Sequence, residues 1–235
     1  MRFLLTSLLS FSLLAAENSI EIDTKGSNSS IYIDQIGSGN TARVWCGLSN
    51  GTYSTHSCSS ATIDIDQDGT SNVARAYSQL ISHTGNEYKI EQTGDDNFGY
   101  IDADDDSNDM DIVSNGNNND AEIYMQGDNN VYSITQTGND KEGEVRAFGD
   151  SSNFSINQSG SGEHYAKIYA SNSADNNDAS IAQTGSGDHY MRLNFYTDDY
   201  SVTASQSGTT NKSITATYNC VTNCTKTVVI NQFDQ

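Results

Sequence analysis

The chain has 235 residues, and its 31 acidic against 11 basic residues give a net charge of −20. This charge argues against a nucleic-acid partner, because phosphate binding needs clusters of Lys and Arg, and against docking onto anionic lipid. The sequence contains no Pro. Since Pro removes a donor from a β-ladder, its absence suits a chain made almost entirely of strands and turns.

Residues 1–16 have the features of a secretory signal peptide. Arg2 supplies the positive charge, residues 3–14 form a short apolar run, and Ala15 and Ala16 offer a small-residue cleavage site. The run is too short to span a bilayer. We therefore expect a secreted mature chain of residues 17–235 with no membrane span.

The mature region begins with a half unit at residues 20–26, and a complete unit follows at residues 29–46. Ile33 and Gln35 of this unit alternate with polar residues, and a period of two indicates a strand with one buried face. A turn at residues 37–39 leads to a second alternating strand. We attribute this turn to its glycines, because Gly reaches backbone angles that are closed to other residues.

The pattern apolar-x-Ile-x-Gln-x-Gly recurs nine times, with successive Gln slots 22 to 32 residues apart. Ser114 fills the Gln slot once and Ala204 fills the Ile position once. Such a period indicates stacked repeats rather than a compact mixed domain. The residues predicted to form structural ladders are Ile33, Gln35, Gly37, Asn40, Ile65, Gln67, Gly69, Asn72, Ile90, Gln92, Gly94, Asn97, Ile112, Gly116, Ile134, Gln136, Gly138, Ile156, Gln158, Gly160, Ile181, Gln183, Gly185, Gln206, Gly208, Ile230 and Gln232.

These repeats predict an all-β protein. No single unit can bury its apolar face alone, so equivalent strands stack with Ile on Ile and Gln on Gln. The predicted fold is a β-solenoid of about nine strand-turn-strand repeats that form two facing parallel sheets, a rod roughly 40 Å long at about 4.8 Å per repeat.

Two inserts interrupt the period, near residues 45–60 and 219–225, and they carry the cysteines. An even number of cysteines in local pairs predicts two short disulfides in an exported chain. Free thiols, or a zinc site that joins both inserts, remain the alternatives. The four cysteines are Cys46, Cys58, Cys220 and Cys224.

Two candidate metal or pH-sensing sites have simpler explanations. The run from Asp64 to Gly69 imitates the start of a calcium-binding loop, but Arg75 stands where that loop needs a Glu. We interpret the run as the solvated face of a strand. His164 and His189 occupy matching places in adjacent repeats, so they should stack; a metal site or a pH response is one interpretation, and a duplicated turn sequence is the simpler one.

No nucleophile elbow, phosphate loop or zinc-protease motif occurs in the chain. The carboxylates face solvent by their strand parity, and no apolar pocket singles one out. We therefore expect neither an enzyme nor a cofactor or dedicated metal site.

The first unit resembles the curlin repeat, Ser-x5-Gln-x-Gly-x-Gly-Asn-x-Ala-x3-Gln, of the curli fibres of Gram-negative bacteria. The residues that match are Ser29, Gln35, Gly37, Gly39, Asn40 and Ala42, and Cys46 replaces the final Gln. Residues 89–102 resemble a repeat of the minor, nucleating curli subunit. The chain differs from typical curlins in its four cysteines, its larger number of repeats, its long inserts and the lack of a Gly-rich leader.

This resemblance implies a structural subunit of extracellular, curli-like amyloid fibres in biofilm matrix and adhesion. The implied partners are further copies of the chain, other curli subunits and the outer-membrane curli secretion machinery. Main subunit, nucleator and adhesin remain open as roles. The alternative is a monomeric secreted β-solenoid that binds a surface or ligand, as adhesins and ice-binding solenoids do.

Stacked acidic residues are expected to regulate assembly. Asp34, Asp66 and Glu91 precede their Gln slots and should face outward on consecutive repeats, where like charges repel. Glu122 and Glu144 should form a second acidic pair. Acid or divalent cations are therefore expected to accelerate assembly.

Overall fold

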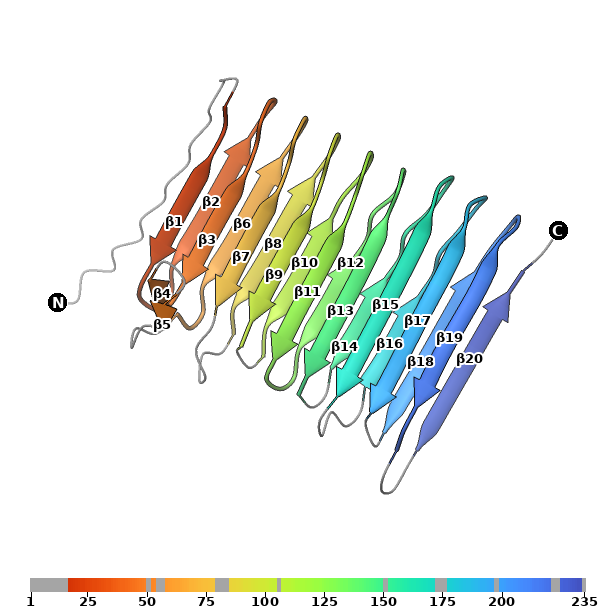
Figure 1. The fold of residues 1–235 in the computed structure, drawn as a ribbon. Coiled ribbons are helices and arrows are strands. Elements are labelled where there is room, and N and C mark those ends of the chain that lie inside the picture. Colours follow the sequence, from red (N-terminus) through yellow and green to blue (C-terminus); the bar gives the residue numbers. More distant parts are fainter. Residues whose placement is uncertain are drawn as a thin grey trace.

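The computed structural model describes residues 17–49, 52–53, 58–78, 85–104, 107–149, 152–171, 177–196, 199–220 and 225–233. It contains two parallel sheets of nine strands each, stacked as the two faces of a β-solenoid (Figure 1). The predicted all-β solenoid is confirmed. The predicted signal peptide lies outside the described residues.

The two sheets divide the strands by the parity of their labels. The odd sheet consists of β1 (Ile20–Thr24), β3 (Ala42–Cys46), β7 (Ala74–Ser78), β9 (Gly99–Ala103), β11 (Ala121–Gln126), β13 (Glu142–Phe148), β15 (His164–Ser171), β17 (His189–Tyr196) and β19 (Lys212–Tyr218). The even sheet consists of β2 (Ser30–Gln35), β6 (Thr62–Gln67), β8 (Glu87–Gln92), β10 (Asp109–Val113), β12 (Val131–Ile134), β14 (Asn153–Ile156), β16 (Asn177–Ile181), β18 (Tyr200–Gln206) and β20 (Lys226–Gln232).

One rung of the solenoid is an even-sheet strand together with the odd-sheet strand that follows it. Eight complete rungs run from β2/β3 to β18/β19, and β1 and β20 are half rungs at opposite ends of the rod (Figure 1). Every pair of neighbours within the two sheets is parallel and in register; Ile33, for example, pairs with Ile65, and Ile65 with Ile90.

The core lies between the sheets and is built from the inward residues of each strand. Ile65, Ile90, Ile112 and Ile134 are completely buried and follow one another in register along the even sheet. Strict alternation of buried and partly exposed residues in β6 and β3 explains why the sequence forms strands, since a period of two places every second side chain in the core.

The tight turns between the sheets differ from the sequence-based explanation. Gly37 has a φ of 26°, but Ser38 after it has a φ of 99°, and Thr70 and Asp95 hold the same place with φ of 91° and 81°. Left-handed backbone is therefore carried mainly by non-glycine residues. Asp95 Oδ1 accepts a hydrogen bond from Thr70 N at 2.8 Å, so contacts between rungs stabilise these conformations.

The first cysteine insert is closed by a disulfide between Cys46 and Cys58, whose Cα atoms are 5.7 Å apart. A short antiparallel hairpin of β4 (Leu48–Ser49) and β5 (Thr52–Tyr53) lies within this insert. Cys220 is also disulfide-bonded, and its predicted partner, Cys224, lies outside the described residues.

Among the described residues, none belongs to a helix with the length and hydropathy needed to cross a membrane.

Candidate functional site: the internal ladders and the two end strands

The glutamines of the repeat form a hydrogen-bonded column inside the solenoid. In the N-terminal part, Gln67 Nε2 donates to Gln35 Oε1 at 2.7 Å and Gln92 Nε2 donates to Gln67 Oε1 at 3.1 Å. These side chains are at most 1% exposed. The column thus satisfies polar groups in the core, where an unpaired amide would destabilise the fold.

The C-terminal part of the Gln column runs in the opposite direction. Gln136 Nε2 donates to Gln158 Oε1 and Gln158 Nε2 to Gln183 Oε1, both at 2.7 Å, and Gln183 Nε2 donates to Gln206 Oε1 at 2.9 Å. Each donor here acts toward the following rung, whereas each donor in the N-terminal part acts toward the preceding one. Ser114 lies where the direction changes.

A second column consists of the asparagines that follow the turns. Asn97 Nδ2 donates to Asn72 Oδ1 at 2.8 Å, and the side-chain amides of Asn72 and Asn40 and of Asn119 and Asn97 contact each other at 3.1 Å and 2.7 Å. All four side chains are buried. Because the register repeats from rung to rung, each Asn lies beside the equivalent Asn of the adjacent rung.

The Asn column continues as a column of basic side chains. The sequence predicted the stacked histidines of this column but not Lys141 or its continuity with the asparagines. Lys141, His164 and His189 follow Asn119 on successive rungs and are also buried. Lys141 Nζ donates to the carbonyl oxygens of Asn139 at 2.6 Å and Gly160 at 3.1 Å. The sequence does contain a signal for the place of Lys141 in this column: Lys141 lies five residues after Gln136, as Asn40 lies five residues after Gln35.

The two histidines stack as predicted, with ring centroids 4.7 Å apart and planes 5° from parallel. They lie in the interior rather than in an exposed turn. His189 Nε2 contacts the carbonyl oxygen of Thr184 at 2.7 Å, and His164 Nε2 contacts that of Ser159. Burial lowers the pKa of His164, and the nearby Lys141 and His189 lower it further, although the Ser159 carbonyl acts in the opposite direction.

A third column, at the edge opposite the tight turns, was also missed. Asn86 Oδ1 accepts from Ala61 N at 2.8 Å, Asn108 Oδ1 from Asn86 N at 3.0 Å, and Asn130 Oδ1 from Asn108 N at 3.2 Å. These asparagines stand six residues before their Gln slots, as Ser29 does before Gln35. The constant offset was the available signal.

The outer face of the even sheet is acidic over its first rungs. Asp34, Asp66 and Glu91 are in register on β2, β6 and β8. Burial raises the pKa of Asp66, and the negative charges of Glu91 and Asp34 raise it further. Asp64 and Asp66 lie within β6, so the prediction of a strand face in place of a calcium loop is confirmed.

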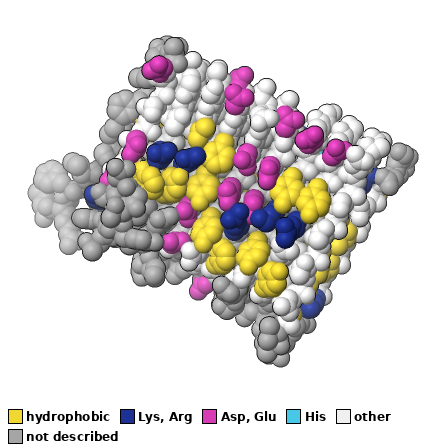
Figure 2. All heavy atoms as spheres, viewed as in Figure 1, with side chains coloured by type: hydrophobic (Ala, Val, Ile, Leu, Met, Phe, Trp, Pro, Cys, Tyr) yellow, Lys and Arg dark blue, Asp and Glu magenta, His cyan; other side chains and the backbone are white. Residues whose placement is uncertain are grey.

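The outer face of the odd sheet is more varied. Figure 2 shows hydrophobic and basic side chains gathered over it, with acidic side chains between them. Trp45 and Tyr77 stack with centroids 4.1 Å apart, and Tyr165 and Tyr190 stack at 5.2 Å. These rings therefore stack from one rung to the next along the rod.

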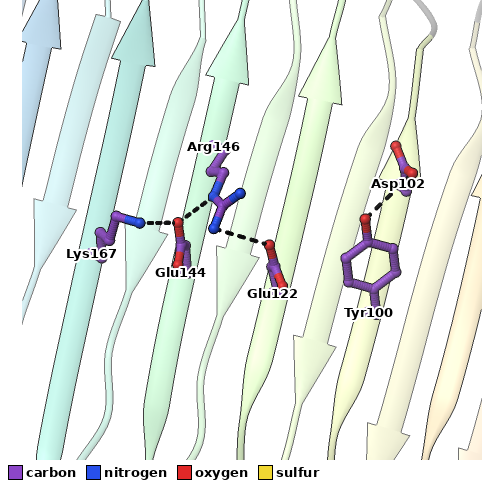
Figure 3. Close-up of polar contacts among 6 residues, drawn as sticks. All are labelled: Tyr100, Asp102, Glu122, Glu144, Arg146 and Lys167. Atoms are coloured by element: carbon purple, nitrogen blue, oxygen red, sulfur yellow. Dashed lines mark hydrogen bonds and ion pairs between the residues drawn. The ribbon is translucent and has the colours of Figure 1, made fainter.

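Glu122 and Glu144 are in register as an acidic pair, but their mutual repulsion is offset (Figure 3). Arg146 contacts both carboxylates, lying 3.7 Å from Glu122, and Lys167 contacts Glu144. Burial opposes ionisation of Glu144, yet hydrogen bonds from Arg146 and Lys167 hold its pKa below the usual value. The two carboxylates are therefore part of a local ion-pair network and are not a site of unopposed repulsion, as the sequence had suggested.

The two ends of the described rod present strand edges without a neighbour. β1 and β2 end the two sheets on one side, and β19 and β20 end them on the other. Val228 and Ile230 of β20 are 39% and 40% exposed, although Val202 and Ala204, their partners on β18, are completely buried. These two side chains continue the core columns, and no further strand of the described residues covers them.

The end strands repeat the backbone and side-chain pattern of the rungs inside the rod. Among the described residues, no cluster of three or more His, Cys, Asp or Glu side chains is placed to hold a metal ion. What the end strands offer instead is a template of backbone and ladder groups, each of which matches the rung beside it.

Comparison with known proteins identifies no relative: no family model, no curated protein and no solved structure matches the chain.

Replacing Gln158 by Leu should break the Gln column. The variant leaves Gln136 Nε2, Gln183 Oε1 and the Tyr165 carbonyl without their present partner or donor. Each buried polar group that stays unpaired costs about 1–3 kcal/mol, and denaturant unfolding measures the sum. Gln126→Leu, at an exposed position, is the control and should change stability by less than about 0.5 kcal/mol. Equal losses for the two variants would show that the ladder contributes nothing.

Replacing His164 and His189 together by Asn should remove an acid-dependent loss of stability. Because the folded-state pKa of His164 is lowered, its stabilising contribution is complete above the unfolded value of about 6.5 and is lost as the pH falls through the folded value. Below that value a protonated His164 would lie beside Lys141. The other titratable groups around Lys141 and His164 are Asp140, Glu163 and Asp188 from the turns and Glu142, Tyr165 and Tyr190 from β13, β15 and β17.

The measurement is the thermal midpoint between pH 7.5 and pH 5. We expect the midpoint of the wild-type protein to fall more than that of the double variant, by several degrees if about 1 kcal/mol is involved. Parallel pH profiles would contradict the role of the histidines.

Proposed function

We propose that this protein is a structural fibre subunit that polymerises head to tail, adding rungs of one molecule to rungs of the next. The observation that carries the proposal is the pair of complementary half rungs, β1 at one end and β20 at the other. A second molecule that places its β1 on β19 and its β2 on β20 completes a rung from two halves. Such a contact does not close on itself and therefore gives a filament.

The register inside the solenoid defines the residues at this joint. Ile20 pairs with Ala42 and Gln35 with Gln67 within the molecule, and Gln206 pairs with Gln232. Continuing that register places Gln232 of one molecule on Gln35 of the next. In the same way Val228 and Ile230 would cover the core positions of β2 in the next molecule, which removes their exposed apolar surface from water.

The distribution of charge favours this polarity of assembly. The even sheet carries its outward acidic residues on the first rungs, Asp34 and Asp66 among them, whereas its last strands carry Thr203, Ser205 and Asn231. A head-to-tail joint therefore sets Asp34 beside neutral Asn231. A head-to-head joint would bring the acidic first rungs of two molecules together, and like charges in adjacent strands repel.

The biological setting of the proposal rests on the resemblance to curlin repeats. By that resemblance the fibre would be extracellular, curli-like functional amyloid at the surface of a Gram-negative bacterium, with roles in biofilm matrix and adhesion. Its partners would be copies of itself or other curli subunits, and the curli secretion machinery would export it. A monomeric solenoid that binds a surface or ligand is the competing function and is distinguished by the same experiments.

Two variants of β20 test the joint by introducing the same positive charge on opposite faces of the strand. Ile230 belongs to the core positions and Asn231 to the outer face. Ile230→Lys should leave the monomer folded, because the side chain is already 40% exposed, but should stop elongation by burying an unpaired charge at the joint. Asn231→Lys should elongate at least as fast as the wild-type protein, since its charge would lie beside Asp34.

Filament length by negative-stain electron microscopy and light scattering give the elongation rate, with circular dichroism as the control for folding. Loss of elongation in Ile230→Lys alone supports the joint. If the wild-type protein stays a folded monomer under all conditions, the competing function is favoured. If both variants elongate at the wild-type rate, the interface lies elsewhere.

Lowering the pH from 8 to 5, or adding calcium, should accelerate filament growth. The joint sets Asp34 beside neutral Asn231, so this effect arises within the first rungs, which receive the next molecule. Burial and the negative charges of Glu91 and Asp34 raise the pKa of Asp66, so these rungs stack more stably as the pH falls toward that pKa and less stably as it rises. Asp66→Asn should grow faster than the wild-type protein at pH 8 and should depend less on pH. Equal growth rates at both pH values, with and without calcium, would reject this regulation.

A further inference from the structure

Between Gln35 and Gln206 the Gln column contains one break, at Ser114 in the fourth rung, between two parts of opposite direction. Gln92 Nε2 donates away from the break to Gln67, and Gln136 Nε2 donates away from it to Gln158. The amide oxygens of Gln92 and Gln136 therefore both face Ser114.

Protein contacts fix these orientations. Gln92 Nε2 also donates to the carbonyl oxygen of Phe98 at 2.7 Å, and Gln136 Nε2 donates to that of Glu142 at 2.8 Å. Exchanging O and N in either amide would set an oxygen against a carbonyl oxygen. Gln92 Oε1, Gln136 Oε1 and Ser114 Oγ have no hydrogen-bond partner in the protein, and their side chains are at most 1% exposed.

We infer that this break is an internal water site that holds a pair of ordered water molecules. Gln92 and Gln136 are two rungs apart, which is roughly 10 Å at about 4.8 Å per rung. A single water that donates to two acceptors, each at about 2.8 Å, spans less than about 6 Å. Two waters reach: each donates to one Gln oxygen, and the Ser114 hydroxyl donates to one water and accepts from the other.

The size and chemistry of the break agree with this occupancy. Ser lacks three of the non-hydrogen atoms of Gln, and two water oxygens occupy a similar space. The partners are polar, and buried polar cavities hold water whereas apolar ones stay dry. A Gln at position 114 could donate to only one of the two oxygens and would turn its own oxygen toward the other. Ser114 with two waters therefore supplies a donor to both Gln oxygens, whereas a Gln at this position supplies a donor to only one.

The site is independent of the proposed assembly, and it is tested by counting long-lived internal waters with oxygen-17 relaxation dispersion. Ser114→Gln should hold two fewer such waters than the wild-type protein, because the longer side chain fills the break. Ser155→Gln, on the outer face of β14, is the matched control and should leave the count unchanged. An equal count in the wild-type protein and Ser114→Gln would overturn the inference.

A second variant separates water binding from simple space filling. Ser114→Leu also expels the waters but offers no polar group, so both Gln oxygens stay unpaired, and its thermal midpoint should lie below that of Ser114→Gln. Equal midpoints would mean that the two oxygens need no donor. If neither variant folds, the wild-type structure at better than about 1.5 Å resolution decides: two ordered waters support the site, and a dry break or a rotated Gln amide rejects it.

Discussion

The in-register stacking of parallel strands is the constraint on which the rest of this structure depends. Once rung follows rung at a fixed spacing, every inward side chain meets the equivalent side chain of its neighbours. An Ile then needs an Ile or another apolar residue beside it, and a buried Gln needs an amide. The fold is thus stabilised by columns that run along the rod, and each rung depends on the next for both its core and its polar partners.

The columns also explain where the protein departs from its own repeat. Ser114 interrupts the Gln column at the place where the direction of donation reverses, and Lys141, His164 and His189 take over the Asn column in the C-terminal half. A substitution at one rung changes what the adjoining rungs must supply. The buried basic stretch is therefore supported by carbonyl oxygens, as at Lys141, where the asparagines had supported one another.

Outward residues differ from inward ones because their neighbours on adjacent rungs need not be of the same kind. On the odd sheet, charges of opposite sign lie within reach, so Arg146 bridges Glu122 and Glu144. On the even sheet, acidic residues stack at the N-terminal end and give way to neutral residues at the C-terminal end. The same periodicity that builds the core thus gives the rod two unlike ends, and a polar rod with matching half rungs is suited to directional addition of further copies.

The pairing of Cys46 with Cys58 was one of the alternatives that the sequence left open, and the structure decided it. The sequence by itself determined the all-β solenoid, the Ile and Gln columns and the half units at each end. These follow from periodicity, because a period of two combined with a long repeat permits only stacked strands. Only the tertiary structure decided which atoms bond along a column, that Ser38 and Thr70 carry left-handed backbone, and that Arg146 lies between two glutamates. The Asn86 column was missed because its members vary between Asn, Ala and Ser. The direction of each ladder depends on amide orientation. Carbonyl groups near the start of the following strand set this orientation, and the spacing of residues does not reveal it.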